Sequence, residues 1–329
     1  RPSRSGLLWT GHGPSPASER AATGLPSSAW LDKGLRVRGG GRPAAPAPRS
    51  VGTKICEHII ATRPWSWTAG IVPVILTATL LNQEHDIPVF SVGLLRSLVL
   101  VVFLQASGNL VNSCIDFNQG VDKVDTAGDR AIVDNLVTPK RALVLASVLF
   151  LVAVGQVVPA FLDEATRKDL LYTGGLGLVL TYGYTAWPLR LKYRALGDLT
   201  VFALFGPMLM RVAALLISGE PCPWLLPYSI PVALLCEAIL HANNTRDIMQ
   251  DRAAGISTLA SVVGYRASQW LYYAMVLGAY ASAAVLAAKQ FTGMFLVLLT
   301  LPIAFVALKG FQPLVSWESV IWWRPFQPP

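Results

Sequence analysis

The chain has 329 residues, of which 53% are hydrophobic and only 14% are Asp, Glu, Lys or Arg, whereas a soluble domain carries about 25% charged residues. This composition excludes an ordinary water-soluble globule. The formal net charge of +8 does not indicate nucleic-acid binding, because residues 1–50, with eight basic and two acidic side chains, account for +6 of it.

Residues 1–50 form a basic segment rich in glycine and proline. The segment contains eight Gly and seven Pro, and it has too few apolar side chains to offset the entropy lost on ordering. We therefore predict a disordered tail. It has neither an initiator Met nor an apolar stretch of signal-peptide quality, so the sequence is expected to be a fragment or an imperfect gene product.

Eight apolar segments of membrane-spanning length follow within residues 51–310. A membrane helix needs about 20 apolar residues, and interruptions by Pro or Gly are tolerated where neighbouring helices satisfy the freed backbone groups. The sequence therefore predicts an all-α polytopic membrane bundle. Residues 311–329 hold no further span, and we expect this atypical end to be truncated or mispredicted. The predicted spans are 64–81, 92–115, 142–162, 170–187, 196–218, 224–241, 268–288 and 291–308.

Basic residues in the loops predict the orientation of the bundle. Cytoplasmic loops carry an excess of Lys and Arg, and ten basic loop residues lie on the same side as the tail, against three on the other side. The tail and the loops after the even-numbered spans are therefore predicted to be cytosolic. Some of these basic residues are also suited to binding an anion.

Two clusters of acidic and amide side chains follow even-numbered spans and so face the same side. In each cluster a spacing of four residues places side chains on one helical face. Such acids at a membrane helix end are costly unless they are partnered. The polar members are Asn112, Asp116, Asp122, Asn243, Asp247 and Asp251.

The residue types in these clusters predict a magnesium site. Hard oxygen ligands with no Cys or His among them favour Mg²⁺, which usually keeps substrate phosphates as ligands. Two converging acidic clusters would repel each other without cations between them. The alternative is that each acidic residue is a helix cap or a solvated loop residue, but the repetition of the pattern on one side favours a diphosphate-binding site.

Several other residues are weaker candidates. Arg63 could bind phosphate or anchor the first span at the interface, and Lys192 could bind diphosphate or contribute to topology. The ring of Tyr184 could face a cationic intermediate, or it could simply pack. His241 is expected to be a hydrogen-bonded helix residue, while Glu237 lies within a span and requires a partner. Three arginines beside the clusters are suited to phosphate: Arg130, Arg246 and Arg252.

At the two clusters the chain resembles the UbiA superfamily of intramembrane aromatic prenyltransferases, and most closely its animal, menaquinone-forming branch. The resemblance covers about residues 55–310. The stretch 184–192 is more like the bacterial menaquinone branch, and the family fold has nine membrane helices where eight spans are readable here. The matching stretches are 63–67, 108–122, 128–134, 196–198, 205–207, 240–247 and 251–259.

The resemblance implies Mg²⁺-dependent transfer of a geranylgeranyl chain from its diphosphate to reduced menadione, which gives menaquinone-4, a vitamin K2. It also implies a lipid-facing cavity for the isoprenoid, a membrane of the endoplasmic reticulum or Golgi, and HMG-CoA reductase as a partner. The implied Mg²⁺ ligands are Asp116, Asp122, Asp247 and Asp251, with Asn112 and Asn243 assisting.

Other functions stay open at this stage. Rival acceptors are 1,4-dihydroxy-2-naphthoate, 4-hydroxybenzoate and homogentisate, and a mitochondrial membrane is the alternative location. From a different class, a cation-coupled transporter would also place acids within a membrane bundle. That alternative expects acids near mid-span, whereas here the acids gather at one face.

Overall fold

The computed structural model describes residues 50–118, 131–134, 136–289 and 292–310, with side chains in all of these except 292–295. The described helices belong to one compact unit, Ser50–Pro329. Among the described residues no strand is present, and one isolated bridge joins Arg194 to Ser257. The all-α prediction is confirmed. The α-helices are α1 (Val51–Ala61), α2 (Thr68–His85), α3 (Val92–Asn118), α4 (Pro139–Gly155), α5 (Val158–Leu162), α6 (Glu164–Gly183), α7 (Gly197–Ala203), α8 (Leu209–Ser218), α9 (Leu226–Arg246), α10 (Ile248–Ala253), α11 (Leu259–Val263), α12 (Tyr265–Lys289) and α13 (Leu301–Gly310).

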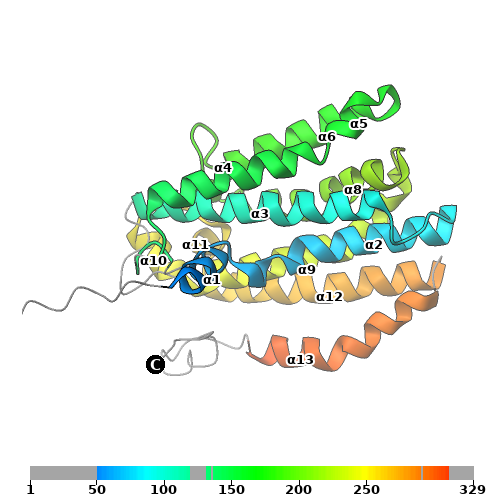
Figure 1. Ribbon diagram of the computed structural model, residues 1–329. Helices are drawn as coiled ribbons and strands as arrows, with labels where there is room; N and C mark the ends of the chain where they lie inside the picture. The colour runs from blue at the N-terminus through cyan, green and yellow to red at the C-terminus, as the bar shows by residue number, and fades with distance from the viewer. Residues whose placement is uncertain (1–49, 119–130, 135, 290–291, 311–329) are drawn as a thin grey trace, which may run out of the picture. The chain divides into compact units, whose positions relative to one another are not determined.

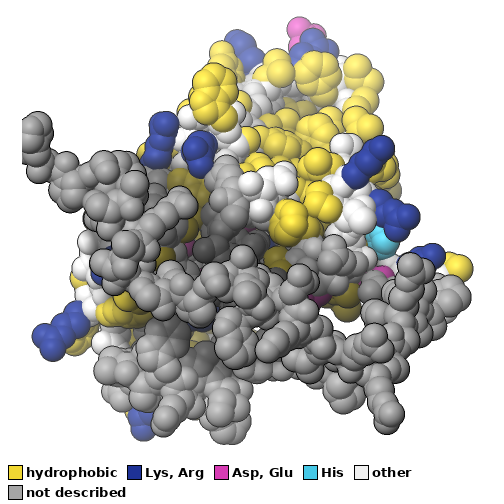
Figure 2. Space-filling view, turned by 90° about the vertical axis from the view of Figure 1, so that its left-hand side faces the viewer, with side chains coloured by type: hydrophobic (Ala, Val, Ile, Leu, Met, Phe, Trp, Pro, Cys, Tyr) yellow, Lys and Arg dark blue, Asp and Glu magenta, His cyan; other side chains and the backbone are white. Residues whose placement is uncertain are grey.

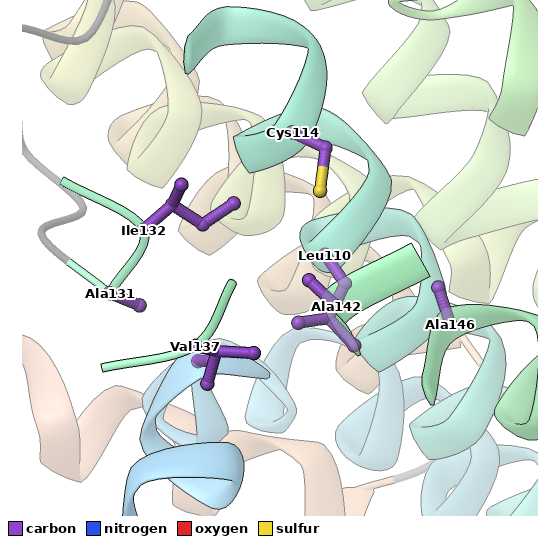
Figure 3. Packing of buried hydrophobic residues seen from close by; sticks show 8 residues of the cluster. Leu110, Cys114, Ala131, Ile132, Val137, Ala142 and Ala146 are labelled. Atoms are coloured by element: carbon purple, nitrogen blue, oxygen red, sulfur yellow. The ribbon is translucent and has the colours of Figure 1, made fainter. Parts of the chain in front are cut away.

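The long helices run side by side in a bundle (Figure 1). Helix α3 packs against α2, α4 and α8, and α9 packs against α7 and α12. Between α3 and α4 the buried residues are mainly small, as Figure 3 shows for Leu110, Cys114, Ala142 and Ala146. The hydroxyl of Ser107 adds a hydrogen bond of 2.8 Å to the carbonyl of Ala146. Small residues let membrane helices approach closely, so α3 and α4 form a tightly packed pair.

Five described segments have the length and hydropathy of a membrane span: Pro64–His85, Val92–Asn118, Gly197–Ser218, Pro223–Arg246 and Tyr265–Lys289. These five correspond to the predicted spans that begin at residues 64, 92, 196, 224 and 268. The predicted total of eight is not confirmed. The last predicted span, 291–308, consists of a 3₁₀ segment (Thr292–Thr300) followed by the short helix α13.

The two remaining predicted spans differ from the observed helices for local reasons. The predicted span 142–162 is divided, because α4 ends at Gly155 and a separate short helix, α5, follows. Helix α6 begins at Glu164, where the side chain of Asp163 accepts a hydrogen bond from the backbone N–H of Ala165. Charged residues fill its first turns, so the apolar pattern alone placed its start too late.

The span Gly197–Ser218 contains a π-helical segment, Leu204–Met208. Pro207 within it has no backbone N–H to donate, which favours such a local widening of the helix. At Gly206 a Cβ atom would lie only 2.5 Å from the Cβ of Ala233 in α9. The glycine therefore permits the close contact between this segment and α9, which brings α7 to the polar side chains of α9.

Candidate functional site

Asp116 lies near the C-terminal end of α3, and only 5% of its surface is exposed. Its carboxylate receives two short hydrogen bonds from the segment that follows α6. The Nζ atom of Lys192 is 2.7 Å from Oδ2, and the hydroxyl of Tyr193 is 2.6 Å from Oδ1. Burial next to this carboxylate raises the pKa of Tyr193, so its hydroxyl keeps the proton that it donates.

The segment 184–196, which we call the connecting loop, contacts the first acidic cluster and the segment that follows the second. At its start, Thr185 donates a hydrogen bond of 2.7 Å to the side-chain oxygen of Asn112. Its backbone folds back on itself, since the N–H of Lys192 donates to the carbonyl of Tyr184 at 2.8 Å. Near its end, Arg194 forms the bridge with Ser257, beyond α10. The loop thereby joins the first cluster to the region of the second.

The second cluster lies where α9 ends and α10 begins. Asp247 is the residue between the two helices, and it is paired with the guanidinium of Arg246 through two hydrogen bonds of 2.7 Å. Asp251, in α10, is buried and accepts a hydrogen bond of 2.9 Å from Thr258. Arg252 is held by the carbonyl of Ser261 at 2.6 and 3.0 Å. Two carboxylates and two guanidinium groups thus surround this junction.

Electrostatics connect the two clusters. Burial raises the pKa of Asp251 to about 6, and the hydrogen bond from Thr258 opposes this rise. Asp247 and Asp116 both add to the rise, and Lys192 opposes it, so these three charged groups from both clusters and the loop act on Asp251. The clusters lie at the end of the bundle occupied by α10 and α11, and Lys and Arg side chains are scattered over the described surface of that end (Figures 1 and 2).

The chemistry of these side chains fits a divalent cation. Asp251 is a buried carboxylate that accepts a hydrogen bond from one neutral hydroxyl, and a cation would relieve both its burial cost and its repulsion with Asp116 and Asp247. In this structure the charge of Asp116 is balanced by Lys192, and that of Asp247 by Arg246. The same cations are suited to binding phosphate oxygens.

The other residues predicted for the site are less completely placed. Asp122 and Arg130 lie outside the described residues. Asn243 is exposed, whereas the adjacent Asn244 is buried. Arg63, which follows α1 and adopts the left-handed backbone conformation, donates to the hydroxyl of Ser113 at 3.1 Å.

Tyr184 lies close to the gathered charges. Asp116, Asp198 and Glu237 all act electrostatically on its hydroxyl. A Cβ atom at Gly197 would lie 3.4 Å from the ring of Tyr184, which is an ordinary contact distance. The ring therefore lies against the start of α7, within electrostatic range of Asp116 and Glu237.

The sequence interpretation missed four residues that orient the site. Tyr193 and Thr185 contact residues more than 70 positions away in the chain, and no local pattern indicates such contacts. Thr258 follows the second cluster and holds Asp251. Asn244 donates a hydrogen bond to Asp198. The sequence signal that could have indicated Asn244 is its position directly after Asn243.

Comparison with known proteins identifies the family. The model of the UbiA prenyltransferase family matches residues 71–326. The chain belongs to the UbiA prenyltransferase family. It is 36% identical over 271 residues to the UbiA prenyltransferase domain-containing protein 1 homolog of Drosophila melanogaster, a match that covers 80% of this chain and 74% of that protein. The human UbiA prenyltransferase domain-containing protein 1 is also 36% identical, with 80% and 78% covered.

The fold agrees with this assignment. The solved structure of a UbiA homologue from Archaeoglobus fulgidus bound to GPP and Mg²⁺ matches with a TM-score of 0.56 at 14% identity, and the match covers 77% of this chain and 86% of that chain. This UbiA-family chain is an aromatic prenyltransferase and an integral membrane protein. The enzyme prediction is confirmed, and the family assignment decides against the transporter alternative.

Replacing Tyr193 with Phe is expected to raise the Mg²⁺ concentration needed for half-maximal activity by about tenfold, because partners that orient metal-binding carboxylates typically contribute 10- to 100-fold. The substitution removes the hydrogen bond to Asp116 and keeps the ring that packs under Arg190, whose guanidinium carbon is 4.9 Å from the ring centre. A Mg²⁺ titration of prenyl transfer measures this change.

Tyr172→Phe is the matched control for this prediction, because Tyr172 is 74% exposed on α6. The control should keep the parental Mg²⁺ dependence. An unchanged Mg²⁺ dependence in Tyr193→Phe would show that the hydroxyl of Tyr193 does not orient a metal-binding carboxylate.

Proposed function

We propose that this UbiA-family chain transfers a geranylgeranyl group from its diphosphate to a naphthoquinol such as menadiol, which gives menaquinone-4, and that the reaction depends on Mg²⁺. The observation that carries the proposal is the convergence of Asp116, Asp247 and Asp251 with Lys192 at one end of the bundle. Support for the branch comes from the animal relatives, and support for the donor class and the metal comes from the homologue solved with GPP and Mg²⁺.

The acidic residues would hold Mg²⁺ against the diphosphate. Asp116, Asp247 and Asp251 supply carboxylate oxygens, and Asp122, Asn112 and Asn243 remain proposed partners. Bound Mg²⁺ would neutralise negative charge that develops on the departing diphosphate. The surrounding cations would bind the phosphate oxygens directly. These proposed phosphate-binding residues are Arg63, Arg130, Lys192, Arg246 and Arg252.

Bond breaking and bond making would take place next to Tyr184. The bond between the first prenyl carbon and the diphosphate oxygen breaks, a bond from that carbon to the quinol ring forms, and the ring carbon loses its proton. The face of an aromatic ring attracts cations, so Tyr184 would stabilise positive charge on the prenyl group. The apolar helix surfaces would accommodate the rest of the isoprenoid chain within the bilayer.

Location and partners follow the same reasoning. We propose a membrane of the endoplasmic reticulum or Golgi, with the acidic clusters on the cytosolic side, because the basic loop residues lie mostly on that side. A mitochondrial membrane remains the alternative location. Association with HMG-CoA reductase stays a prediction of the family resemblance.

The test is product identification. Membranes that contain the chain are supplied with labelled geranylgeranyl diphosphate, Mg²⁺ and, in parallel, menadiol, 1,4-dihydroxy-2-naphthoate, 4-hydroxybenzoate and homogentisate. We expect a labelled product with the mass of menaquinone-4 in the menadiol reaction, and none in membranes without the chain. A product formed only from 4-hydroxybenzoate or homogentisate would overturn the naphthoquinol assignment.

A further inference from the structure

Three potential metal ligands meet in the interior of the bundle, apart from the two acidic clusters. Asp198 of α7 and Glu237 and His241 of α9 each offer one ligand atom, and these atoms all lie within 4.8 Å of one another. Their exposed fractions are 5%, 3% and 0%. We propose that these residues, the inner triad, bind a divalent transition-metal ion such as Zn²⁺ or Mn²⁺, distinct from the ions held at the diphosphate.

Glu237 supplies the observation that points to a ligand. Both of its carboxyl oxygens are buried, and in the described part of the chain neither receives a hydrogen bond from an N–H or hydroxyl group; the carboxyl group of Asp198 is close enough to share a proton with it. A polar group buried without a partner costs free energy, and the cost is greatest for a charged group inside a membrane span. A cation bound between Glu237 and its two neighbours would satisfy these oxygens.

His241 is oriented as a metal ligand would be. Its Nε2 atom lies 3.1 Å from the backbone carbonyl oxygen of Ser268 in α12, and because a carbonyl only accepts, Nε2 carries the proton. The Nδ1 atom lies 2.8 Å from the carboxylate of Asp198, which also only accepts, so Nδ1 donates to it here, and loss of that proton would free the Nδ1 lone pair for a metal ion. Metal-binding histidines commonly donate their second ring N–H to a backbone carbonyl in this way.

Distances and donor types favour a transition ion over Mg²⁺. Ligand atoms at about 2.0 to 2.2 Å from a metal lie at most about 4.4 Å apart, so the observed spacing needs only a small contraction. Imidazole suits Zn²⁺, and carboxylates suit Zn²⁺ and Mn²⁺, whereas Mg²⁺ prefers oxygen ligands alone. Asn244 donates to the second oxygen of Asp198 at 3.0 Å and fixes that carboxylate in place.

The charges of Asp198 and Glu237 also favour a divalent ion. In the described residues no Lys or Arg forms an ion pair with Asp198 or Glu237, and the ionic partner that Asp198 has is His241. Two carboxylates and one divalent ion form a neutral group, which is far less costly in an apolar interior than a net negative one. The ion would link α7 to α9 directly below Tyr184.

The experiment measures metal content and stability without turnover. The full chain is purified in detergent with Mg²⁺ present, incubated with Zn²⁺ or Mn²⁺, freed of unbound ions and subjected to elemental mass spectrometry. We expect about one transition ion per chain in the parent and a several-fold loss in Glu237→Gln, since binding at a buried site requires all of its ligands. Glu220→Gln, at an exposed loop position, and Asp247→Asn should both keep the ion.

Chelation tests the same site through stability. A strong chelator should lower the melting temperature of the parent by several degrees and leave that of Glu237→Gln unchanged. If the parent holds no transition ion above the level of Glu237→Gln, the proposal is wrong, and a proton shared between the two carboxyl groups would replace the ion. The transition-ion content of the parent alone can contradict the proposal, so the proposal stays testable even if Glu237→Gln does not fold.

Discussion

Replacing Asp247 with Asn is expected to lower the rate of prenyl transfer by about 100-fold or more, which is the usual effect of removing one electrostatic contact where charge develops. Asn keeps the size of the side chain and can occupy the same position between α9 and α10. The change removes the charge that Asp247 contributes beside Asp251. Because Asp247 is partly exposed and its ion pair within the described residues is with a surface arginine, membrane insertion and melting temperature should stay close to those of the parent. Product formation from labelled donor measures the rate.

Asp116→Asn is expected to reduce the rate by a similar factor and to lower the melting temperature as well. Asp116 is buried with Lys192, and removal of one partner from a buried pair leaves an unbalanced charge. Asp86→Asn is the matched control. Asp86 is exposed and adopts the left-handed conformation after α2, which Asn also tolerates. Near-parental rates in both Asp116→Asn and Asp247→Asn would rule out the proposed active site.

Removing divalent cations should abolish the reaction. If Mg²⁺ supplies several kcal/mol of stabilisation to the departing diphosphate, its loss corresponds to a rate lower by about 1,000-fold or more. EDTA treatment of membranes that contain the chain, followed by assay with labelled donor, measures this loss. Adding Mg²⁺ in excess of the chelator should restore transfer, because chelation leaves the proposed carboxylate ligands unchanged.

EDTA saturated with Mg²⁺ beforehand is the control for this experiment, and it should leave the rate unchanged. Full turnover in membranes stripped of divalent ions would contradict the assignment of Asp116, Asp247 and Asp251 to a metal site. The inner triad is distinguished by the restoring ion, because Mg²⁺ alone should restore transfer, whereas the transition ion of the triad is followed by elemental content and melting temperature.

The sequence predicted those parts of the fold that depend on long uninterrupted apolar segments. The spans containing α2, α3, α9 and α12 were located to within a few residues, because length and hydropathy define them. The predicted spans between α4 and α6 differ from the observed helices. A pattern of apolar residues indicates neither the helix end at Gly155 nor the start of α6, whose first turns are charged.

The site was predictable only in part. The acidic residues could be proposed from the sequence because a charge at a membrane helix end is conspicuous. The contacts of Tyr193 with Asp116, of Thr185 with Asn112 and of Asn244 with Asp198 were not predicted, because they are tertiary contacts that only the packed bundle creates. Glu237 was recognised as needing a partner, but the convergence of Asp198 and His241 on it depends on how α7 packs against α9.

The connecting loop has a consequence for how the site keeps its dimensions. Lys192 and Tyr193 hold Asp116 on α3, while Arg194, the next residue along, is bridged to Ser257 beyond α10. The gap between the two acidic clusters is thus spanned by three consecutive residues of one short loop. A single-residue insertion between Tyr193 and Arg194 would change the separation of the two anchored parts of the loop, and with it the gap between the clusters, without replacing any acidic residue. Loop length is accordingly a means of retuning the fit of the diphosphate without changing any group that contacts it.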